Sequence, residues 1–330
     1  METRTPGTGK PAASAVPDVI DDRYRIERDI GRGGMATVYL ATDTQSGDRV
    51  AIKILRSELG SAVVKERFLR EIAFVSELDH PQIPKVLGSG IIGKVPYYVM
   101  TYIDGESLRA RLDRERQIDL DETRRIAVAV ARAMSYAHSR GILHRDIKPA
   151  NILISAEHVH VLDFGVARAV IASAEDALTS AGMVVGTPAY MSPEQALAEG
   201  SLDGRSDIYS LGCVIYEMIT GTPPFLGATA QAIMSRRFLG PPPPLEHARD
   251  GVPEDLSGAV MKSLAKNLDD RWQTADAFAA ALSGATPVVE IPQLDQAAPE
   301  TTRSRRNPFI IAGAIAAVIV AIVAAWLVIE

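Results

Sequence analysis

The sequence has 330 residues, of which 47% are hydrophobic, and this is enough for two or three packed units with a sizeable core. Its formal net charge of −6 argues against a broad nucleic-acid-binding surface, so we expect no nucleic-acid partner. The single cysteine, Cys213, lies in the apolar run SLGCVIYEM and cannot form an intramolecular disulfide. We therefore expect the folded part to occupy a reducing compartment, with Cys213 as a core residue rather than a nucleophile.

The first stretch of the chain is rich in Pro, Gly, Ala, Ser and Thr and has no apolar periodicity. Such a composition cannot bury enough apolar surface to offset the entropy of ordering. We expect a disordered arm over residues 1–23.

A glycine-rich loop, GRGGMA, follows at residues 31–36. A dinucleotide-binding loop follows a strand and opens a helix, but here both flanks, residues 24–30 and 37–43, have strand patterns. Glycines at the tip of a hairpin bring backbone N–H groups close to phosphate oxygens without an intervening Cβ. An ordinary glycine-rich hairpin has the same pattern, so the loop alone does not decide between the two.

A lysine, Lys53, interrupts the next predicted strand, RVAIKIL, at residues 49–55. A buried ammonium group is costly unless it meets an anion, although such a lysine usually extends to the surface. The segment 66–78 has the periodicity of a helix with one buried face, made of Phe68, Ile72, Val75 and Leu78. Glu71 lies beside that face, and together with Lys53 it indicates an ion pair that orients phosphate.

A long helix is predicted from Asp119, because Asp119 and Glu122 resemble a capping box and Gly141 suits the C-terminal end. The polar stretch HRDIKPANIL, residues 144–153, then predicts a loop that leads into a short strand.

This loop carries chemistry-bearing side chains that neither a strand nor a helix face needs. Asp146 is a carboxylate that can accept a hydroxyl proton, and Lys148 can meet a transferred phosphoryl group. Asn151, with Asp163 of VLDFGVAR, offers oxygen ligands suited to Mg²⁺.

The glycine loop, V-A-I-K, the helix glutamate, H-R-D-x-K-x-x-N, D-F-G and S-P-E occur here in the order of the protein-kinase signature. Over residues 24–282 the sequence resembles the bacterial Hanks-type (eukaryotic-like) serine/threonine protein kinases, many of which are membrane-anchored. The resemblance implies an α+β, two-lobed protein kinase fold. Its small β-rich N-lobe would cover residues 24–103, and its large helical C-lobe would cover residues 104–282.

The resemblance also implies ATP and Mg²⁺ as cofactors. Asp146 would be the catalytic base and Lys148 a second catalytic residue, while Asn151 and Asp163 would hold the metal. Lys53 would bind the α- and β-phosphates and pair with Glu71. Further nucleotide contacts implied by the resemblance are Ile30, Gly31, Arg32, Gly33, Gly34, Met35, Ala36, Thr37, Val38, Ala51, Met100, Thr101, Ile103 and Leu153.

Some implied roles are structural or concern positions that depart from the family pattern. Glu194 and Arg271 match a buried ion pair of the large lobe, and Asp207 matches the helix aspartate that anchors the catalytic loop. Ala36 replaces the third loop glycine, and Thr101 stands where relatives often carry Glu. Neither departure implies an inactive enzyme. The other loop glycines remain, and the hinge, residues 101–103, would bind adenine through main-chain atoms.

The resemblance implies protein substrates phosphorylated on Ser or Thr, because Lys148 and Thr187 are the family's marks of that specificity. The first alternative is a catalytically weak pseudokinase scaffold, which predicts loss of Lys53, Asp146 or Asp163. The second is a small-molecule phosphotransferase of the same fold, which the substrate-platform segment GTPAYMSPE disfavours. For activation we expect autophosphorylation between Asp163 and Glu194, at Thr179 or Ser180.

The C-terminal part has two further predicted segments. Residues 283–308, rich in Pro, Ala, Gln and Thr, read as a linker. Residues 309–329 contain no charged side chain, and as a helix they span about 31 Å, the thickness of a bilayer's hydrocarbon core. We therefore expect a single-pass transmembrane helix in the inner (cell) membrane, with the kinase domain cytoplasmic because Arg303, Arg305 and Arg306 precede it.

Small residues recur every four positions along one face of this segment, at Gly313, Ala317, Ala321 and Ala325. Such faces let helices approach closely in lipid and would permit a homodimer. Simple alanine richness gives the same pattern, so the two interpretations remain open.

Overall fold

The computed structural model describes residues 16–34, 36–56, 62–156, 158–164, 188–197 and 202–284. They all belong to one structural unit within Met1–Pro287. Most of the predicted arm and linker, the expected phosphorylation sites and the segment 309–329 lie outside the described residues. None of the helices in the described part of the chain has both the length and the hydropathy that a membrane crossing requires.

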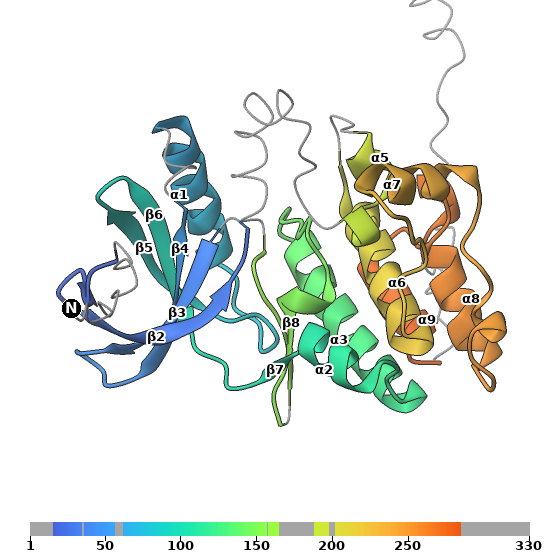
Figure 1. The fold of residues 1–330 in the computed structure, drawn as a ribbon, viewed down its shortest axis with the longest axis horizontal. Helices are drawn as coiled ribbons and strands as arrows, with labels where there is room; N and C mark the ends of the chain where they lie inside the picture. Colours follow the sequence, from blue (N-terminus) through green and yellow to red (C-terminus); the bar gives the residue numbers. More distant parts are fainter. Residues whose placement is uncertain are drawn as a thin grey trace, which may run out of the picture. The chain divides into compact units, whose positions relative to one another are not determined.

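The N-terminal half forms an antiparallel sheet in the order β1-β2-β3-β4-β6-β5, with helix α1 beside it (Figure 1). The elements are β1 Val19–Ile20, β2 Tyr24–Arg32, β3 Ala36–Asp43, β4 Arg49–Leu55, α1 Ala62–Ser76, β5 Val86–Ile92 and β6 Val95–Thr101. Strand β1 lies inside the expected disordered arm. Its Ile20 is 1% exposed in the apolar cluster on one face of the sheet, and this burial explains why regular structure is present before residue 23, against the expectation.

Alternation along β6 separates the two faces of the sheet. Tyr97 and Val99 belong to the apolar cluster that includes Ile20, whereas Tyr98 and Met100 belong to the main core. The predicted helix face packs against this second side, and Phe68, Ile72, Val75 and Leu78 are all buried as expected. The strand alternation and the helix period therefore place Met100 and Tyr98 under α1.

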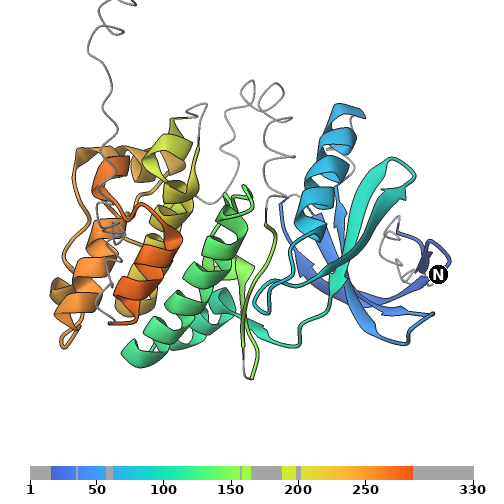
Figure 2. The ribbon, with the colours of Figure 1, turned by 180° about the vertical axis from the view of Figure 1, so that it is seen from behind.

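The C-terminal half begins with a small three-stranded sheet, ordered β7-β8-β9, and continues as helices (Figure 2). The strands and 3-10 turns are β7 Glu106–Ser107, η2 Pro149–Asn151, β8 Ile152–Ile154, β9 Val159–Val161, η4 Pro188–Tyr190, η5 Leu245–His247 and η6 Leu268–Asp270. The helices are α2 Leu108–Glu115, α3 Leu120–His138, α5 Pro193–Ala196, α6 Gly204–Thr220, α7 Ala230–Leu239, α8 Glu254–Ser263 and α9 Ala275–Leu282.

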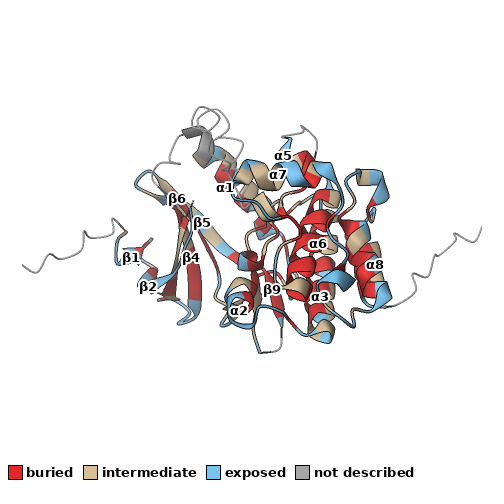
Figure 3. Ribbon diagram, turned by 45° about the vertical axis from the view of Figure 1, so that its right-hand side comes forward, coloured by how far each residue is buried: buried red, intermediate tan, exposed pale blue. Residues whose placement is uncertain are grey.

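Helix α6 is the core of this half, and it is buried from Ser206 to Ile219 (Figure 3). It contacts α3, α8 and α9. Cys213 lies in it and is fully buried, as expected, and burial raises the pKa of its thiol to about 12. A helix that is enclosed on every side can position polar groups rigidly, and the candidate site uses this property.

Helix α3 begins where predicted, because the Asp119 side chain caps it by accepting from the N–H groups of Asp121 and Glu122. The expected capping box is only half present. The Glu122 carboxylate instead binds Arg111, whose two terminal nitrogens each lie 2.6 Å from its oxygens. A bidentate arginine competes strongly for a carboxylate, which explains the difference.

The expected buried ion pair between Glu194 and Arg271 is present. Arg271 Nη1 and Nη2 each lie 2.8 Å from one Glu194 oxygen, and Ser206 Oγ donates to the same carboxylate at 2.6 Å. Burial alone would raise the pKa of Glu194, but the bonds from Arg271 and Ser206 outweigh it and lower the pKa. The pair links α5 to the segment between η6 and α9.

We predict that Arg271→Met lowers the free energy of unfolding of the helical lobe by about 3–5 kcal/mol, because it leaves the Glu194 carboxylate buried without its cation. Urea unfolding measures this loss. Arg205→Met is the matched control, because its partners Asp203 and Asp269 are 49% and 95% exposed, and it should cost less than about 1 kcal/mol. Equal losses for the two variants would contradict a structural role for the buried pair.

Candidate active site

The sheet register assembles the phosphate-binding face predicted from the sequence. Val38 pairs with Gly31 on one side and with Lys53 on the other, and Lys53 pairs with Tyr98. In the same way, Ala51 pairs with Met100. Residues that are directly opposite across a ladder project to the same face. The glycine loop, Lys53 and Met100 are therefore brought to one side of the sheet.

The glycine loop and the hinge, residues 101–103, leave space or a backbone donor at this face, although the Gly33 N–H is bonded to Ala36 O at 2.9 Å. A Cβ placed on Gly34 would meet no atom within 4 Å, so no internal packing requires glycine there, and a ligand can approach. The neighbouring Arg32 pairs with Asp29, and Met35 lies outside the described residues. At the hinge, Thr101 N–H bonds Lys85 O, whereas the Ile103 N–H has no backbone acceptor in the part of the chain described here.

The apolar positions expected to enclose adenine are less buried than the core. Ile30 is 36% exposed, Val38 and Leu153 are half-buried, and only Ala51 is buried. Large apolar side chains with exposed surface are typical of a ligand-facing wall.

The catalytic loop is fastened to α6 by one carboxylate. Asp207 is 1% exposed and accepts the backbone N–H groups of His144, at 2.8 Å, and Arg145, at 2.7 Å. Arg145 has φ +67°, a left-handed conformation that non-glycine residues rarely adopt. The bonds from Asp207 hold this strained backbone, and this confirms the anchoring role expected for that residue.

His144 supports the loop from inside the core. Its Nε2 lies 2.7 Å from Leu162 O, and its Nδ1 accepts the Asp146 N–H at 3.2 Å. The ring is fully buried, and burial lowers the pKa of His144, so the imidazole is neutral. It therefore joins the loop to the segment that carries Asp163.

The side chains proposed for proton transfer lie together. Lys148 Nζ donates to Asp146 Oδ2 at 2.6 Å, and Asn151 Nδ2 donates to Asp146 O at 2.8 Å and to Oδ2 at 3.1 Å. Asn151 is buried, whereas Asp146 and Lys148 keep about a quarter of their side chains exposed. The carboxylate is thus oriented by its own loop and remains accessible to a substrate hydroxyl.

Asp163 receives one bond on each carboxylate oxygen. Lys53 Nζ donates to Oδ2 at 2.5 Å, and the Tyr98 hydroxyl donates to Oδ1 at 2.6 Å. Burial alone would raise the pKa of Asp163, but Lys53 and the Tyr98 hydroxyl outweigh it and lower the pKa. Burial also raises the pKa of Tyr98 well above its usual value, so the phenol keeps its proton and donates.

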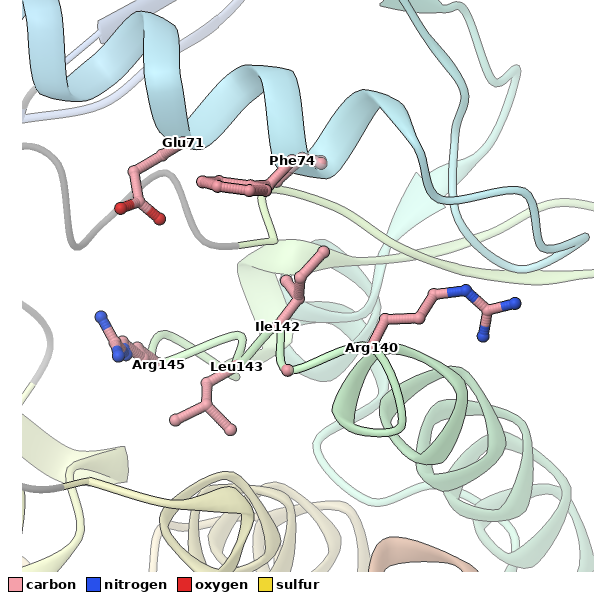
Figure 4. Close-up of a pocket in the computed structure, with 8 residues that line it drawn as sticks. Glu71, Phe74, Arg140, Ile142, Leu143 and Arg145 are labelled. Atoms are coloured by element: carbon pink, nitrogen blue, oxygen red, sulfur yellow. The ribbon is translucent and has the colours of Figure 1, made fainter.

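The ion pair expected between Lys53 and Glu71 is not formed. Lys53 pairs with Asp163 instead, because that carboxylate lies within hydrogen-bond distance. Glu71 points from α1 into a cavity of about 200 Å³, lined also by Phe74, Arg140 and Arg145 (Figure 4). The Glu71 carboxylate and the Arg145 guanidinium extend toward the same space from opposite sides.

Several residues that the motifs do not predict contact the segment expected to form the substrate platform. Tyr190 donates to Glu217 Oε2 at 2.5 Å, and Arg109 donates to Oε1 at 2.8 Å. Arg237 donates to Pro188 O at 2.7 Å from a side chain that is 2% exposed. The spacing of the motifs carries no signal for these contacts, since the partners come from helices far along the chain. Thr187 lies outside the described residues.

Comparison with known proteins agrees with this architecture. The protein kinase domain model matches residues 24–279. The chain is 40% identical over 265 residues to serine/threonine-protein kinase PknB of Mycobacterium leprae, covering 78% of this chain and 42% of the relative. The identity to PknB of Mycobacterium tuberculosis (strain ATCC 25618 / H37Rv) is 41%, with the same coverage. The chain thus spans about two fifths of the length of these curated relatives.

A solved structure shows the same fold. The kinase domain of Mycobacterium tuberculosis PknI matches with a TM-score of 0.66 and 27% identity, covering 82% of this chain and 99% of that one. The matched family model extends over most of the sequence and includes every residue of the site described above. This chain belongs to the protein kinase family.

Proposed function

We propose that this protein is an ATP-dependent serine/threonine protein kinase. One observation carries the proposal: Asp146, Lys148 and Asn151 lie within hydrogen-bond distance of one another on a loop that α6 anchors. The names of its relatives support the same activity. The pseudokinase alternative has no observation in its favour, because Lys53, Asp146 and Asp163 are all present.

The donor set fits Mg²⁺. Asn151 uses its Nδ2 toward Asp146, so its Oδ1 is the atom left to face a cation. Asp163 adds a carboxylate whose pKa is lowered and which is therefore ionised. One carboxylate and one amide oxygen suit Mg²⁺, which binds through one or two carboxylates together with substrate phosphates and water.

In the proposed reaction, Asp146 orients the substrate hydroxyl and accepts its proton as the oxygen attacks the γ-phosphorus of ATP. The bond from that phosphorus to the β,γ-bridging oxygen breaks, and ADP leaves. Lys148, bonded to Asp146, lies where it can neutralise charge on the transferred phosphoryl group. Lys53 would leave Asp163 for the α- and β-phosphates. Bound Mg²⁺ would supply further neutralisation of the phosphate oxygens.

We predict that Asp146→Asn lowers kcat by about 10²–10⁴-fold, because the amide cannot accept the hydroxyl proton. Nucleotide affinity should change little, since it depends on the opposite face of the site. Radiolabel transfer measures kcat, and titration of a fluorescent ATP analogue measures affinity.

Asp269→Asn is the matched control, because it makes the same isosteric change on a side chain that is 95% exposed. It should leave both quantities unchanged. Equal loss of binding and turnover in Asp146→Asn would remove the proton-accepting role from that residue.

We propose further that phosphorylation of the segment between Asp163 and Glu194 activates the kinase. The Arg145 guanidinium extends into the cavity that Glu71 also faces, where a phosphate can bind it (Figure 4). The sequence DALTSAG offers Thr179 and Ser180, and Thr179 is the first choice.

Active enzyme should therefore carry phosphate within residues 166–187, and Thr179→Ala should lower its activity more than Ser180→Ala. Mass-spectrometric phosphosite mapping, before and after incubation with ATP and Mg²⁺, provides the measurement. Fully active enzyme without phosphate in this range would contradict the proposal.

Residues 309–329 support a proposal of membrane anchoring, with the preceding arginines keeping the kinase domain on the cytoplasmic side. Deletion of residues 309–330 should move the protein from the membrane pellet to the alkali-extracted supernatant, without changing its specific activity. Extraction of the undeleted chain by alkali would overturn anchoring and leave the kinase proposal intact.

The small-residue face along Gly313 and Ala317 supports a further proposal, a homodimer of anchors that brings two kinase domains together for trans-phosphorylation.

A further inference from the structure

Tyr98 is not among the predicted nucleotide contacts, yet its side chain lies within the candidate site. It lies on β6, directly opposite Lys53 of β4, and both side chains project toward Asp163. Tyr98 is 2% exposed, and its hydroxyl donates to Asp163 Oδ1 at 2.6 Å. Neighbouring strands thus deliver one donor to each oxygen of the same carboxylate.

The Tyr98 ring has little freedom to leave this bond. Phe68 of α1 packs on it with ring centroids 6.1 Å apart. The cavity beside the ring, which Met100 and Phe164 help to line, has a volume of about 10 Å³ and holds at most one water molecule. Dense packing of this kind fixes the rotamer and aims the hydroxyl.

Asp163 needs such orientation because its backbone is strained. Its φ is +66°, in the left-handed region that non-glycine residues rarely adopt. Such a backbone persists only where surrounding contacts hold it, and the bonds that the two carboxylate oxygens accept are contacts of this kind.

The two hydrogen-bond donors to Asp163, Lys53 and Tyr98, have different roles in the proposed reaction. The proposed mechanism requires Lys53 to leave Oδ2 and bind the ATP phosphates. Tyr98 has no such second task, and its phenol cannot reach solvent. Its bond to Oδ1 is the one that can persist when Oδ2 is released to a cation.

We propose that Tyr98 is a positioning residue, whose hydroxyl holds Asp163 in the orientation that ligates the nucleotide-bound metal ion. The inference rests on the proposed kinase function. Groups that hydrogen-bond metal ligands typically change metal affinity by about 10–100-fold when they are removed.

The test is Tyr98→Phe, which deletes one hydroxyl and keeps the packed ring. Binding of a non-hydrolysable fluorescent ATP analogue is measured at stepped Mg²⁺ concentrations and in EDTA. The expected result is about a tenfold higher Mg²⁺ concentration at half-saturation, with unchanged affinity in EDTA. Excess Mg²⁺ should also restore kcat, because the loss is in affinity rather than in chemistry.

Tyr97→Phe is a closely matched control. Tyr97 is the adjacent residue on the opposite face of β6, is 1% exposed, and likewise donates its hydroxyl to a carboxylate, that of Asp21. This variant loses the same atom from the same strand, away from Asp163. It should keep the Mg²⁺ dependence of the unmodified protein.

The outcomes separate this inference from the proposed function. If the unmodified protein responds to Mg²⁺ and Tyr98→Phe behaves like Tyr97→Phe, the hydroxyl is a packing element and the inference is overturned. A lower Mg²⁺ requirement in Tyr98→Phe would also overturn it, because the hydroxyl would then compete with the metal. If Asp163→Asn leaves the Mg²⁺ response of binding intact and the unmodified protein transfers no phosphate, the kinase proposal itself fails.

Discussion

The buried carboxylate of Asp207 is the interaction on which the rest of the site depends. It accepts two consecutive backbone N–H groups, those of His144 and Arg145, from inside a helix that is enclosed on all sides. Two bonds to adjacent amides fix both the position and the direction of a loop, and the left-handed backbone at Arg145 needs both. Asp146, the proposed catalytic base, follows these two residues directly, so the core of the C-terminal half sets its position.

The same helix organises the substrate side through a second acid, Glu217, which holds Tyr190 and Arg109. The two sides also meet directly, because Gln195 Nε2 donates to Arg145 O at 2.9 Å. The capping box that starts α5 uses the same Gln195 side chain. A displacement of α5 would therefore change the position of the backbone next to Asp146, because the Gln195–Arg145 hydrogen bond links the two segments.

Three strands of the N-terminal half, β2, β3 and β4, and two helices, α1 and α3, could be predicted from the sequence, because alternation and helical period act over a few residues. The order of the motifs could be predicted as well. The strand at residues 49–55 was predicted to the residue. The partner of Lys53 was not, since the choice between Glu71 and Asp163 depends on where α1 lies against the sheet. Tyr98 was missed because a tyrosine in an apolar strand is usually core, and its partner is 65 residues away.

Because Lys53 and Asp163 pair with each other, the proposed nucleotide binding would exchange the ionic partner of each side chain. Each side chain is less than a fifth exposed and neutralises the other, so their desolvation already takes place on folding. Under the proposed function, metal-complexed ATP would offer phosphate to the Lys53 ammonium and a cation to the Asp163 carboxylate, so neither charge would be left buried alone. A nucleotide without its cation would take Lys53 and leave Asp163 unneutralised beside added negative charge. With the proposed function, this ion pair would favour the metal complex over the free nucleotide before any chemistry begins.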